Sequence, residues 1–491
     1  MKLLRTIPFF LLLIPVFFCL HGSVENFGSV NFREVFLIGL SVMGMILLFC
    51  FISRIFTRHR LFAALIVFFI SVWYFFFGAF HDGIKSTPLL HFLRSYTILL
   101  PALMLLTVLW IIFLKRYPRL WPKLTIYFNA LFIIYCITDV VKLTMLIAAP
   151  PKKSQPISFN YSAVTNRPNV YFLLFDGYPG DKSLKDRFNF SNDRFNGFLR
   201  ANNFVRLPVR SNYDITHYSI SSVFNMRYID DEYKVRKAVP KDLQTRQTEI
   251  QHAELFPIFR KMGYRILNYS IFDVEDSPGL SDENSFLLGH SILLTDKILL
   301  NRMKKDLTFL ITDKVVKYLP FLKNQSVFIH RNNNIKAENL INETLKKQDT
   351  VPVFCYAHFL MPHAPYYYDS SGRANPNFNN PKENSPEFIS YLKYTNKVAE
   401  RILLSVKAKD PSAIIIFISD HGFRYNIPLT RSDLDNFDNF CAVHFAGGED
   451  VKIPESISNV NIFPYLFNTC FNQNFSMLKD SSIHQSTSDS E

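Results

Sequence analysis

The sequence predicts a two-part α/β protein: a bundle of membrane helices followed by a domain with a mostly parallel sheet covered by helices on both faces. Three observations predict this organisation. Long apolar stretches fill the first 150 residues, strand-like and helix-like segments alternate from residue 169 onward, and two of the strand-like segments end in carboxylates beside glycine. A chain of 491 residues is long enough for at least two domains.

Five apolar stretches predict a bundle of five transmembrane helices within residues 1–150. Most of them reach or approach the roughly 20 residues that a helix needs to cross the hydrocarbon core. The first stretch is short enough for a cleaved signal peptide, but no clear small-x-small cleavage site follows it, so we expect a retained anchor. The stretches are residues 7–21, 34–56, 61–80, 96–114 and 124–148.

The charges between these stretches predict that the N-terminus lies in the cytoplasm. Lys2 and Arg5 precede the first stretch, and basic residues also gather in the loops after the second and fourth stretches. The alternate loops carry few basic residues, as the positive-inside rule requires. An odd number of spans then places the following domain outside the cytoplasmic (inner) membrane, facing the periplasm or the cell exterior. These loops explain part of the net charge of +13, and no basic stripe with stacking aromatic residues indicates nucleic-acid binding.

Composition divides the rest of the chain into three parts. Residues 151–168 are rich in Pro, Ser and Asn and predict a linker. We expect the α/β domain over residues 169–478 and a disordered tail over residues 479–491. The six cysteines show no paired spacing, which excludes a disulfide framework and a zinc finger.

Segments of alternating character predict the sheet. "NVYFLLFDGYPG" and "VPVFCYAHFL" are continuous apolar runs, as expected of central parallel strands covered on both faces. "SPEFISYLKYTNKVAERILLSVKAKD" has apolar residues at helical spacing and leads directly into the strand-like "SAIIIFISDHG". This alternation is typical of a mostly parallel sheet between two layers of helices, whose ligands gather at the carboxyl ends of the strands.

Chemically reactive side chains follow two of these strands. Asp176 ends one, and the pair Asp420 and His421 ends another. Alone, such an Asp commonly caps the next helix, and such a His commonly bonds a carbonyl. Two strands of one sheet that both end in a carboxylate beside glycine favour a metal site instead. Gly177 and Gly422 allow a tight turn and the close approach of a ligand.

Six stretches, in order, resemble the alkaline phosphatase superfamily. The closer resemblance is to its membrane-anchored, sulfatase-like branch, which includes lipoteichoic acid synthases and phosphoethanolamine transferases. The stretches span nearly all of the predicted α/β domain, and the five-helix anchor is similar in kind to that of the transferases. They are "NVYFLLFDGYPG", "RSNYDITHYSISSVFNMRYID", "YAHFLMPHAPYYYD", "YLKYTNKVAERIL", "FISDHGFR" and "ISNVNIFPYLFNTCF".

The resemblance implies metal ligands and a nucleophile. Asp176, Asp420 and His421 are the implied ligands of one divalent ion, and such oxygen and imidazole donors suit Zn²⁺ or Mn²⁺. Thr216, in "SNYDIT", holds the position of the nucleophile and also touches the metal. A bound divalent ion lowers the pKa of a hydroxyl, so attack by Thr216 would give a phosphothreonine intermediate. The Ser/Thr-rich run around it is also typical of a helix N-terminus with its caps.

Three further residues are candidates for substrate contact. His363, in "MPHAP", is similar to a catalytic histidine that contacts the phosphoryl group or the leaving oxygen, and His358 is a candidate nearby. Arg424 is suited to bind a phosphate oxygen in bidentate fashion. The alternatives are a hydrogen-bonded core histidine for His358 and a surface salt bridge for Arg424.

The resemblance implies metal-dependent transfer of a phosphoethanolamine or phosphoglycerol headgroup from a membrane phospholipid to a surface glycan or lipid. The alternatives are a membrane-anchored hydrolase of phosphodiester or sulfate esters on surface polysaccharide, and a non-catalytic receptor or scaffold.

Two departures from the pattern of the family bear on the choice between these functions. Asp176 stands where the synthases and transferases have Glu, and resembles sulfatases and phosphodiesterases there. No cysteine lies in the C/S-x-P-x-R context that sulfatases convert to an aldehyde hydrate, which disfavours sulfate-ester hydrolysis by that route.

Overall fold

In the computed structural model, the chain forms two compact units. The membrane unit consists of Met1–Lys153 and Glu283–Asn324, and the α/β unit consists of Ser154–Asp282 and Gln325–Glu491. The sequence predicts residues 283–324 within the α/β domain, whereas the structure groups them with the N-terminal helices. The structure describes residues 2–27, 30, 32–57, 59–148, 157–229, 240–280, 292–307, 328–347, 350–376, 378, 386–424, 436–445 and 451–484.

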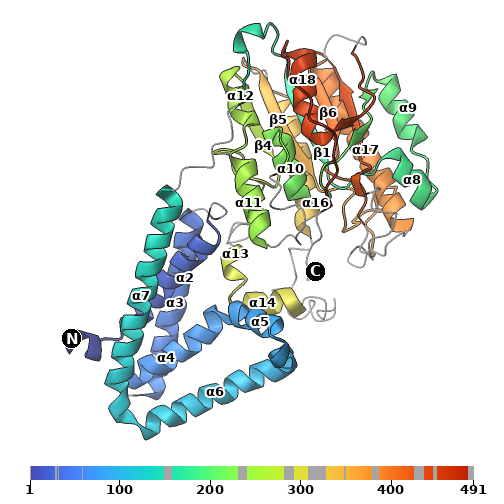
Figure 1. Ribbon diagram of the computed structural model, residues 1–491. Coiled ribbons are helices and arrows are strands. Elements are labelled where there is room, and N and C mark those ends of the chain that lie inside the picture. Colours follow the sequence, from blue (N-terminus) through green and yellow to red (C-terminus); the bar gives the residue numbers. More distant parts are fainter. Residues whose placement is uncertain are drawn as a thin grey trace. The chain divides into compact units, whose positions relative to one another are not determined.

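Apolar helices build the membrane unit (Figure 1). They are α1 (Lys2–Thr6), α2 (Phe10–Glu25), α3 (Phe32–Phe56), α4 (Arg60–Phe75), α5 (Phe77–Ser86), α6 (Tyr96–Arg116) and α7 (Trp121–Ala148), followed much later by α13 (Ile292–Thr295) and α14 (Leu299–Leu307). α3, α6 and the stretch Pro118–Ala148, which contains α7, are each long and apolar enough to cross a membrane. α4 and α5 pass this test only as a pair bent by 59°.

Within the described residues, the unit therefore has three helices that could span a membrane, or four if the bent pair forms one span. The bend lies at Phe76, whose backbone (φ −109°, ψ 14°) leaves the helical region. α2 is apolar but has only 16 residues. The prediction of an apolar helical region is confirmed, and its count of five spans stays a prediction.

The late helices α13 and α14 pack against the N-terminal helices. Leu294 is 2% exposed, and a Cβ added to Gly22 would lie 2.9 Å from its Cγ atom. Arg302 is 8% exposed, forms an ion pair with Asp82, and places Nη1 3.2 Å from Asp296 Oδ2. An apolar contact and a shielded ion-pair network thus hold this segment within the membrane unit.

A six-stranded sheet forms the centre of the α/β unit. Its strands are β1 (Val170–Phe175), β2 (Val205–Arg206), β4 (Arg265–Tyr269), β5 (Val353–Phe359), β6 (Ile414–Ile418) and β7 (Cys441–His444). They lie in the order β2-β7-β6-β1-β5-β4. β4, β5, β1 and β6 are parallel, whereas β7 runs antiparallel to β6, and β2 antiparallel to β7. The α/β class is confirmed, with a mixed sheet whose parallel centre has an antiparallel edge.

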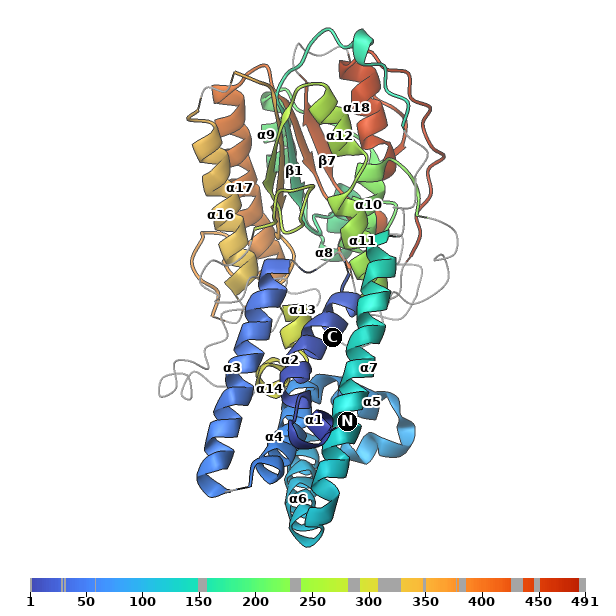
Figure 2. The ribbon, with the colours of Figure 1, turned by 90° about the vertical axis from the view of Figure 1, so that its left-hand side faces the viewer.

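Helices cover both faces of the sheet (Figure 2). One layer contains α10 (Thr216–Asn225), α11 (Pro240–Gln251), α12 (Leu255–Lys261) and α18 (Ile462–Cys470), and the other contains α8 (Asp181–Phe188), α9 (Asp193–Ala201), α16 (Ile329–Thr344) and α17 (Pro386–Lys409). Phe172 of β1 enters the first core and Leu173 enters the second. This burial on both faces explains why β1 is a continuous apolar run.

The predicted linker and tail are described in part. Phe159, within the predicted linker 151–168, is 9% exposed and packs in the hydrophobic core. Residues 479–484, from the predicted tail, are hydrogen-bonded to the α/β unit. Residues 149–156 and 485–491 lie outside the described residues.

Replacing Leu403 by Ala tests the core beneath α17. Leu403 is 0% exposed, whereas its neighbour Leu404 is 44% exposed on the same helix. We expect Leu403→Ala to lower the free energy of unfolding by about 2–5 kcal/mol, because it leaves a cavity. Leu404→Ala should change it by less than about 0.5 kcal/mol. Pulse proteolysis of the full chain in urea measures both, and equal losses in the two variants would contradict this packing.

Candidate metal centre

The parallel pairing of β1 with β6 brings two loops to one edge of the sheet. Leu174 lies opposite Ile418 in this pairing. Asp176 follows β1 directly, and Asp420 follows β6 after one intervening residue. Because both strands run in the same direction, their carboxyl ends carry the two carboxylates to the same edge, where ligands of α/β sheets bind.

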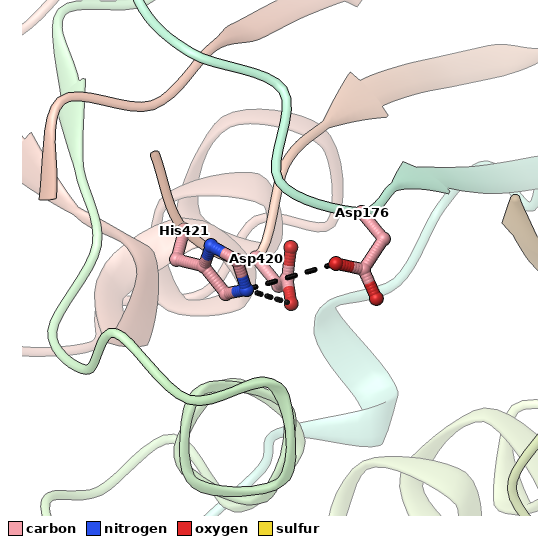
Figure 3. A group of neighbouring side chains, drawn as sticks. All are labelled: Asp176, Asp420 and His421. Carbon is pink, nitrogen blue, oxygen red and sulfur yellow. Dashed lines mark ion pairs between the residues drawn. The ribbon is translucent and has the colours of Figure 1, made fainter. Parts of the chain in front are cut away.

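Asp176, Asp420 and His421 form one cluster (Figure 3). One donor atom from each residue lies within 4.8 Å of the other two. His421 Nε2 is 3.3 Å from Asp420 Oδ2 and 3.6 Å from Asp176 Oδ1. None of the three residues is more than 4% exposed. The predicted metal ligands are therefore close enough to share one ion.

Each residue of the cluster has one atom held by the protein and another left for a ligand. The N–H of Gly177 donates to Asp420 Oδ1 at 3.0 Å, and His358 Nε2 lies 3.3 Å from Asp176 Oδ2. Asp420 Oδ2 and Asp176 Oδ1 are buried and have no hydrogen-bond partner among the described residues. His421 Nδ1 lies 2.7 Å from the carbonyl oxygen of the next residue. With its proton on Nδ1, this imidazole keeps the lone pair of Nε2 for a metal.

The charge states also suit a metal. Burial by itself raises the pKa of Asp176, but the imidazoles of His363 and His358 outweigh it and hold the pKa well below its usual value. Burial lowers the pKa of His421 more than the neighbouring carboxylate of Asp420 raises it. An ionised carboxylate and a neutral imidazole are the forms that coordinate a cation.

The cluster fits a divalent cation. A buried polar atom without a partner costs free energy, and two buried carboxylates repel each other. A cation between them removes both penalties. Carboxylate oxygens and an imidazole nitrogen are also donors that ions such as Zn²⁺ take in proteins. Asp176, Asp420 and His421 are thus the residues of this chain that could hold the metal.

Thr216 lies beside the cluster at the N-terminus of α10. Its Oγ1 atom is 3.4 Å from His421 Nε2, and the residue is 9% exposed. Ser219, on the first turn of the same helix, donates its hydroxyl to the carbonyl of Asp420 at 2.7 Å. This bond ties α10 to the loop that follows β6. The start of a helix also carries a positive potential that favours an anionic oxygen.

His363 and Arg424 also lie beside the cluster. Arg424 Nη2 donates to His363 Nε2 at 3.2 Å. A Cβ added to Gly177 would lie 3.8 Å from His363 Cδ2 and 3.5 Å from His421 Cε1, so this glycine passes close to both imidazoles. Its φ of +65° is one that residues with side chains rarely adopt. The structure brings two of the three predicted substrate contacts, His363 and Arg424, together beside the cluster.

His358 lies behind the cluster. It belongs to β5, is 0% exposed, and has its Nδ1 atom 3.3 Å from the hydroxyl of Tyr356. Its Nε2 atom faces Asp176. The structure therefore places the imidazole of His358 against the carboxylate of Asp176, and its role as a substrate contact stays a prediction.

Two histidines near the cluster were not among the predicted site residues. His217 follows Thr216 directly, and burial lowers its pKa to about 4. His330, in α16, has its ring centre 6.1 Å from that of His363, and burial lowers its pKa as well. Adjacency to Thr216 could have indicated His217. His330 lies in "FIHRNNN", which carries no motif, so only the fold brings it to the site.

Comparison with family models matches the Sulfatase family over residues 313–464. The matched range contains His358, His363, Asp420 and His421, whereas Asp176 precedes it. The matched part of the chain is sulfatase-like, which indicates an enzyme of this type. The resemblance to the alkaline phosphatase superfamily that the sequence indicated is thereby confirmed.

The chain is similar to several solved structures. One is the C-terminal periplasmic domain of EcEptC from Escherichia coli in complex with Zn, with 13% identity, a TM-score of 0.40, and coverage of 66% of this chain and 87% of that one. The soluble domain of lipooligosaccharide phosphoethanolamine transferase A from Neisseria meningitidis has 14% identity, a TM-score of 0.39, and coverage of 62% and 90%. The lipoteichoic acid synthase LtaP from Listeria monocytogenes has 12% identity, a TM-score of 0.35, and coverage of 67% and 77%. No curated protein sequence matches the chain significantly.

His358→Ala should weaken metal binding by the chain without removing a ligand. Loss of the group that orients a ligating side chain typically costs about 10–100-fold in metal affinity. Equilibrium dialysis of the full chain against Zn²⁺ measures this change. His444→Ala is the matched control, because His444 is also buried but bonds the carbonyl of Ala413 at the opposite end of β6. Equal affinities in the two variants would show that His358 has no such role.

Proposed function

We propose that the chain transfers a phosphorylated headgroup, of the phosphoethanolamine or phosphoglycerol class, from a membrane phospholipid to a surface glycan or lipid. The observation that carries this proposal is the place of Thr216, whose hydroxyl oxygen lies 3.4 Å from His421 Nε2 in the buried cluster. The apolar helices of the membrane unit give further support, because they hold the enzyme at the bilayer that contains a lipid donor.

One divalent ion, Zn²⁺ or Mn²⁺, is the proposed cofactor, and Asp176, Asp420 and His421 would hold it. When bound, the ion would lower the pKa of a hydroxyl and offset the negative charge of a phosphodiester. The two unpartnered carboxylate oxygens of the cluster support this set of donors. Oxygen and imidazole donors favour these ions over the softer metals.

Thr216 is the proposed nucleophile of the first step. Its Oγ1 atom would attack the phosphorus of the donor, form a bond to it, and break the bond between phosphorus and the glycerol oxygen of diacylglycerol. Thr216 loses its hydroxyl proton, and the leaving glycerol oxygen gains one. The product is a phosphothreonine that carries the headgroup. The start of α10 supports this role, because its positive potential favours the developing anion.

The acceptor hydroxyl would complete the reaction. Its oxygen would attack the phosphorus of the phosphothreonine, and the bond to Thr216 would break, which restores the threonine hydroxyl once Oγ1 regains a proton. His363 and Arg424 are the proposed contacts to the oxygens of the phosphoryl group. Their 3.2 Å contact with each other, and the place of His363 beside Gly177, support this role.

We further propose that the enzyme crosses the cytoplasmic membrane five times, with α2 as a retained first span and the bent pair α4–α5 as the third. The N-terminus would then lie in the cytoplasm and the α/β unit outside, in the periplasm or at the cell exterior. Basic residues at Arg54, Arg60, Lys115 and Arg116, which lie at the helix ends that this topology places inside, support the orientation.

A hydrolase is the second candidate, and the match to the Sulfatase family model favours it. Water would then take the place of the acceptor hydroxyl, and the substrate would be a phosphodiester or sulfate ester of surface polysaccharide. No cysteine lies in the C/S-x-P-x-R context that the usual sulfatase route requires, which favours the phosphodiester.

Thr216→Ala should abolish headgroup transfer, whereas Thr216→Ser keeps a hydroxyl and should retain part of the activity. Loss of a nucleophile typically lowers kcat by more than about 1000-fold. Incubation with a headgroup-labelled phospholipid measures transfer, and intact-protein mass spectrometry should find a phospho-adduct only where the hydroxyl is present. Thr395→Ala is the control, because Thr395 is buried in α17 and bonds the carbonyl of Tyr391. Full activity in Thr216→Ala would refute the mechanism.

A chromogenic phosphodiester, supplied with and without a hydroxyl acceptor, separates the two candidate functions. A transferase should release the chromophore faster with the acceptor and should yield a phosphorylated acceptor, because the acceptor resolves the phosphothreonine. A hydrolase should release it equally fast in both reactions and form no such product. Chromophore release is followed by absorbance, and the acceptor product by mass spectrometry.

A further inference from the structure

Residues 479–484, which we name the strap, lie along the loop that leads into α10. This loop, residues 211–215, is named the α10 loop. The N–H of Ile483 donates to the carbonyl of Asn212 at 2.8 Å. Ile483 also forms a parallel bridge with Tyr213. The strap therefore extends the backbone pairing of the α10 loop, although the sequence predicts a disordered tail here.

Side chains add to this pairing. Ser482 donates its hydroxyl to the carbonyl of Ser211 at 2.8 Å. Asn212 Nδ2 donates to the carbonyl of Ser481 at 2.8 Å, and its Oδ1 accepts from the N–H of Val460 at 2.7 Å. The α10 loop is thus held by hydrogen bonds to the strap on one side and to Val460, just before α18, on the other.

The last described residue of the strap, His484, forms an ion pair with Asp214 through its Nδ1 atom. Asp214 is 2% exposed and lies two residues before Thr216. From Ser211 to Thr216, no residue is more than 9% exposed. A loop that is buried throughout cannot change its path without moving its neighbours. The ion pair therefore connects the strap to the backbone that sets the position of the Thr216 hydroxyl.

We propose that the strap positions Thr216 for attack, and that His484 is a positioning residue that acts through Asp214. This inference rests on the proposed function, in which Thr216 is the nucleophile. The Asp214 side chain is 3% exposed and that of His484 is 35% exposed, so removing the imidazole would open this side of the carboxylate, which would shift toward its other contacts or toward water. The backbone between Asp214 and Thr216 is short, so Thr216 would move with it. A displacement of about 1 Å at a reacting group costs about 100-fold in rate.

Substitutions of His484 in the full chain test this role. His484→Leu removes the imidazole and its N–H donor, whereas His484→Asn keeps an N–H donor on its side-chain amide. We expect His484→Leu to slow the formation of phosphothreonine in a single turnover by about 10–100-fold. The KM for the donor, the bound zinc and the unfolding temperature should stay close to those of the unchanged chain. His484→Asn should retain most of the rate.

Two deletions form a matched pair that differs by one residue. Deleting residues 485–491 keeps His484 and should leave the rate of phosphothreonine formation unchanged. Deleting residues 484–491 removes it and should reproduce the loss seen in His484→Leu. Agreement between the substitution and the deletion would assign the effect to the imidazole.

The outcomes separate this inference from the proposed function. If Thr216→Ala is inactive and both His484→Leu and the longer deletion react at the normal rate, the strap has no positioning role and the proposed function stands. A parallel loss of rate, zinc content and unfolding temperature would show a purely structural role and would also overturn the inference. Full activity of Thr216→Ala would refute the proposed function and, with it, the proposal for the strap.

Discussion

β1 pairs in parallel with β5 on one side and with β6 on the other, and the metal centre depends on this pairing. The N–H of Gly177 reaches the carboxylate of Asp420 although 243 positions separate them in sequence. Parallel strands require long crossover connections, so each ligand loop arrives from a different part of the chain. The histidine behind Asp176 comes from β5. Three adjacent strands therefore share one cluster, and a shift in any of their registers would disperse it.

The cluster is also an electrostatic constraint on the fold. Asp176 and Asp420 are both buried, and among the described residues their carboxylate oxygens lie within 3.6 Å of histidine nitrogens. Burial keeps His421 neutral, so it does not compensate their charge. A bound cation would therefore stabilise the two loops together, which couples metal binding to the order of this edge of the sheet.

Local sequence patterns predict only part of the fold and of the candidate site. Apolar runs identify β1 and β6, and the carboxylates one or two positions beyond them are necessarily at one edge if the strands are parallel neighbours. The direction in which His358 faces depends instead on the pairing that sets Leu174 opposite it, which no local pattern encodes. No local pattern predicts the positions of His330 or of α13 and α14 either. Their places follow from contacts between distant segments, such as the ion pair of Arg302 with Asp82. The antiparallel edge of the sheet escapes prediction for a related reason, because the strand-like runs that β2 and β7 provide are very short.

The return of α13 and α14 to the N-terminal helices has a consequence for dissecting the protein. A fragment that starts after residue 153 would carry these two helices away from their partners. Leu294 would lose its contact with Gly22 and expose an apolar surface to water, and Arg302 would lose Asp82. Such a fragment would be prone to aggregate even with its sheet intact. A soluble version of the enzyme therefore calls for removal of α13 and α14 in addition to removal of the N-terminal helices.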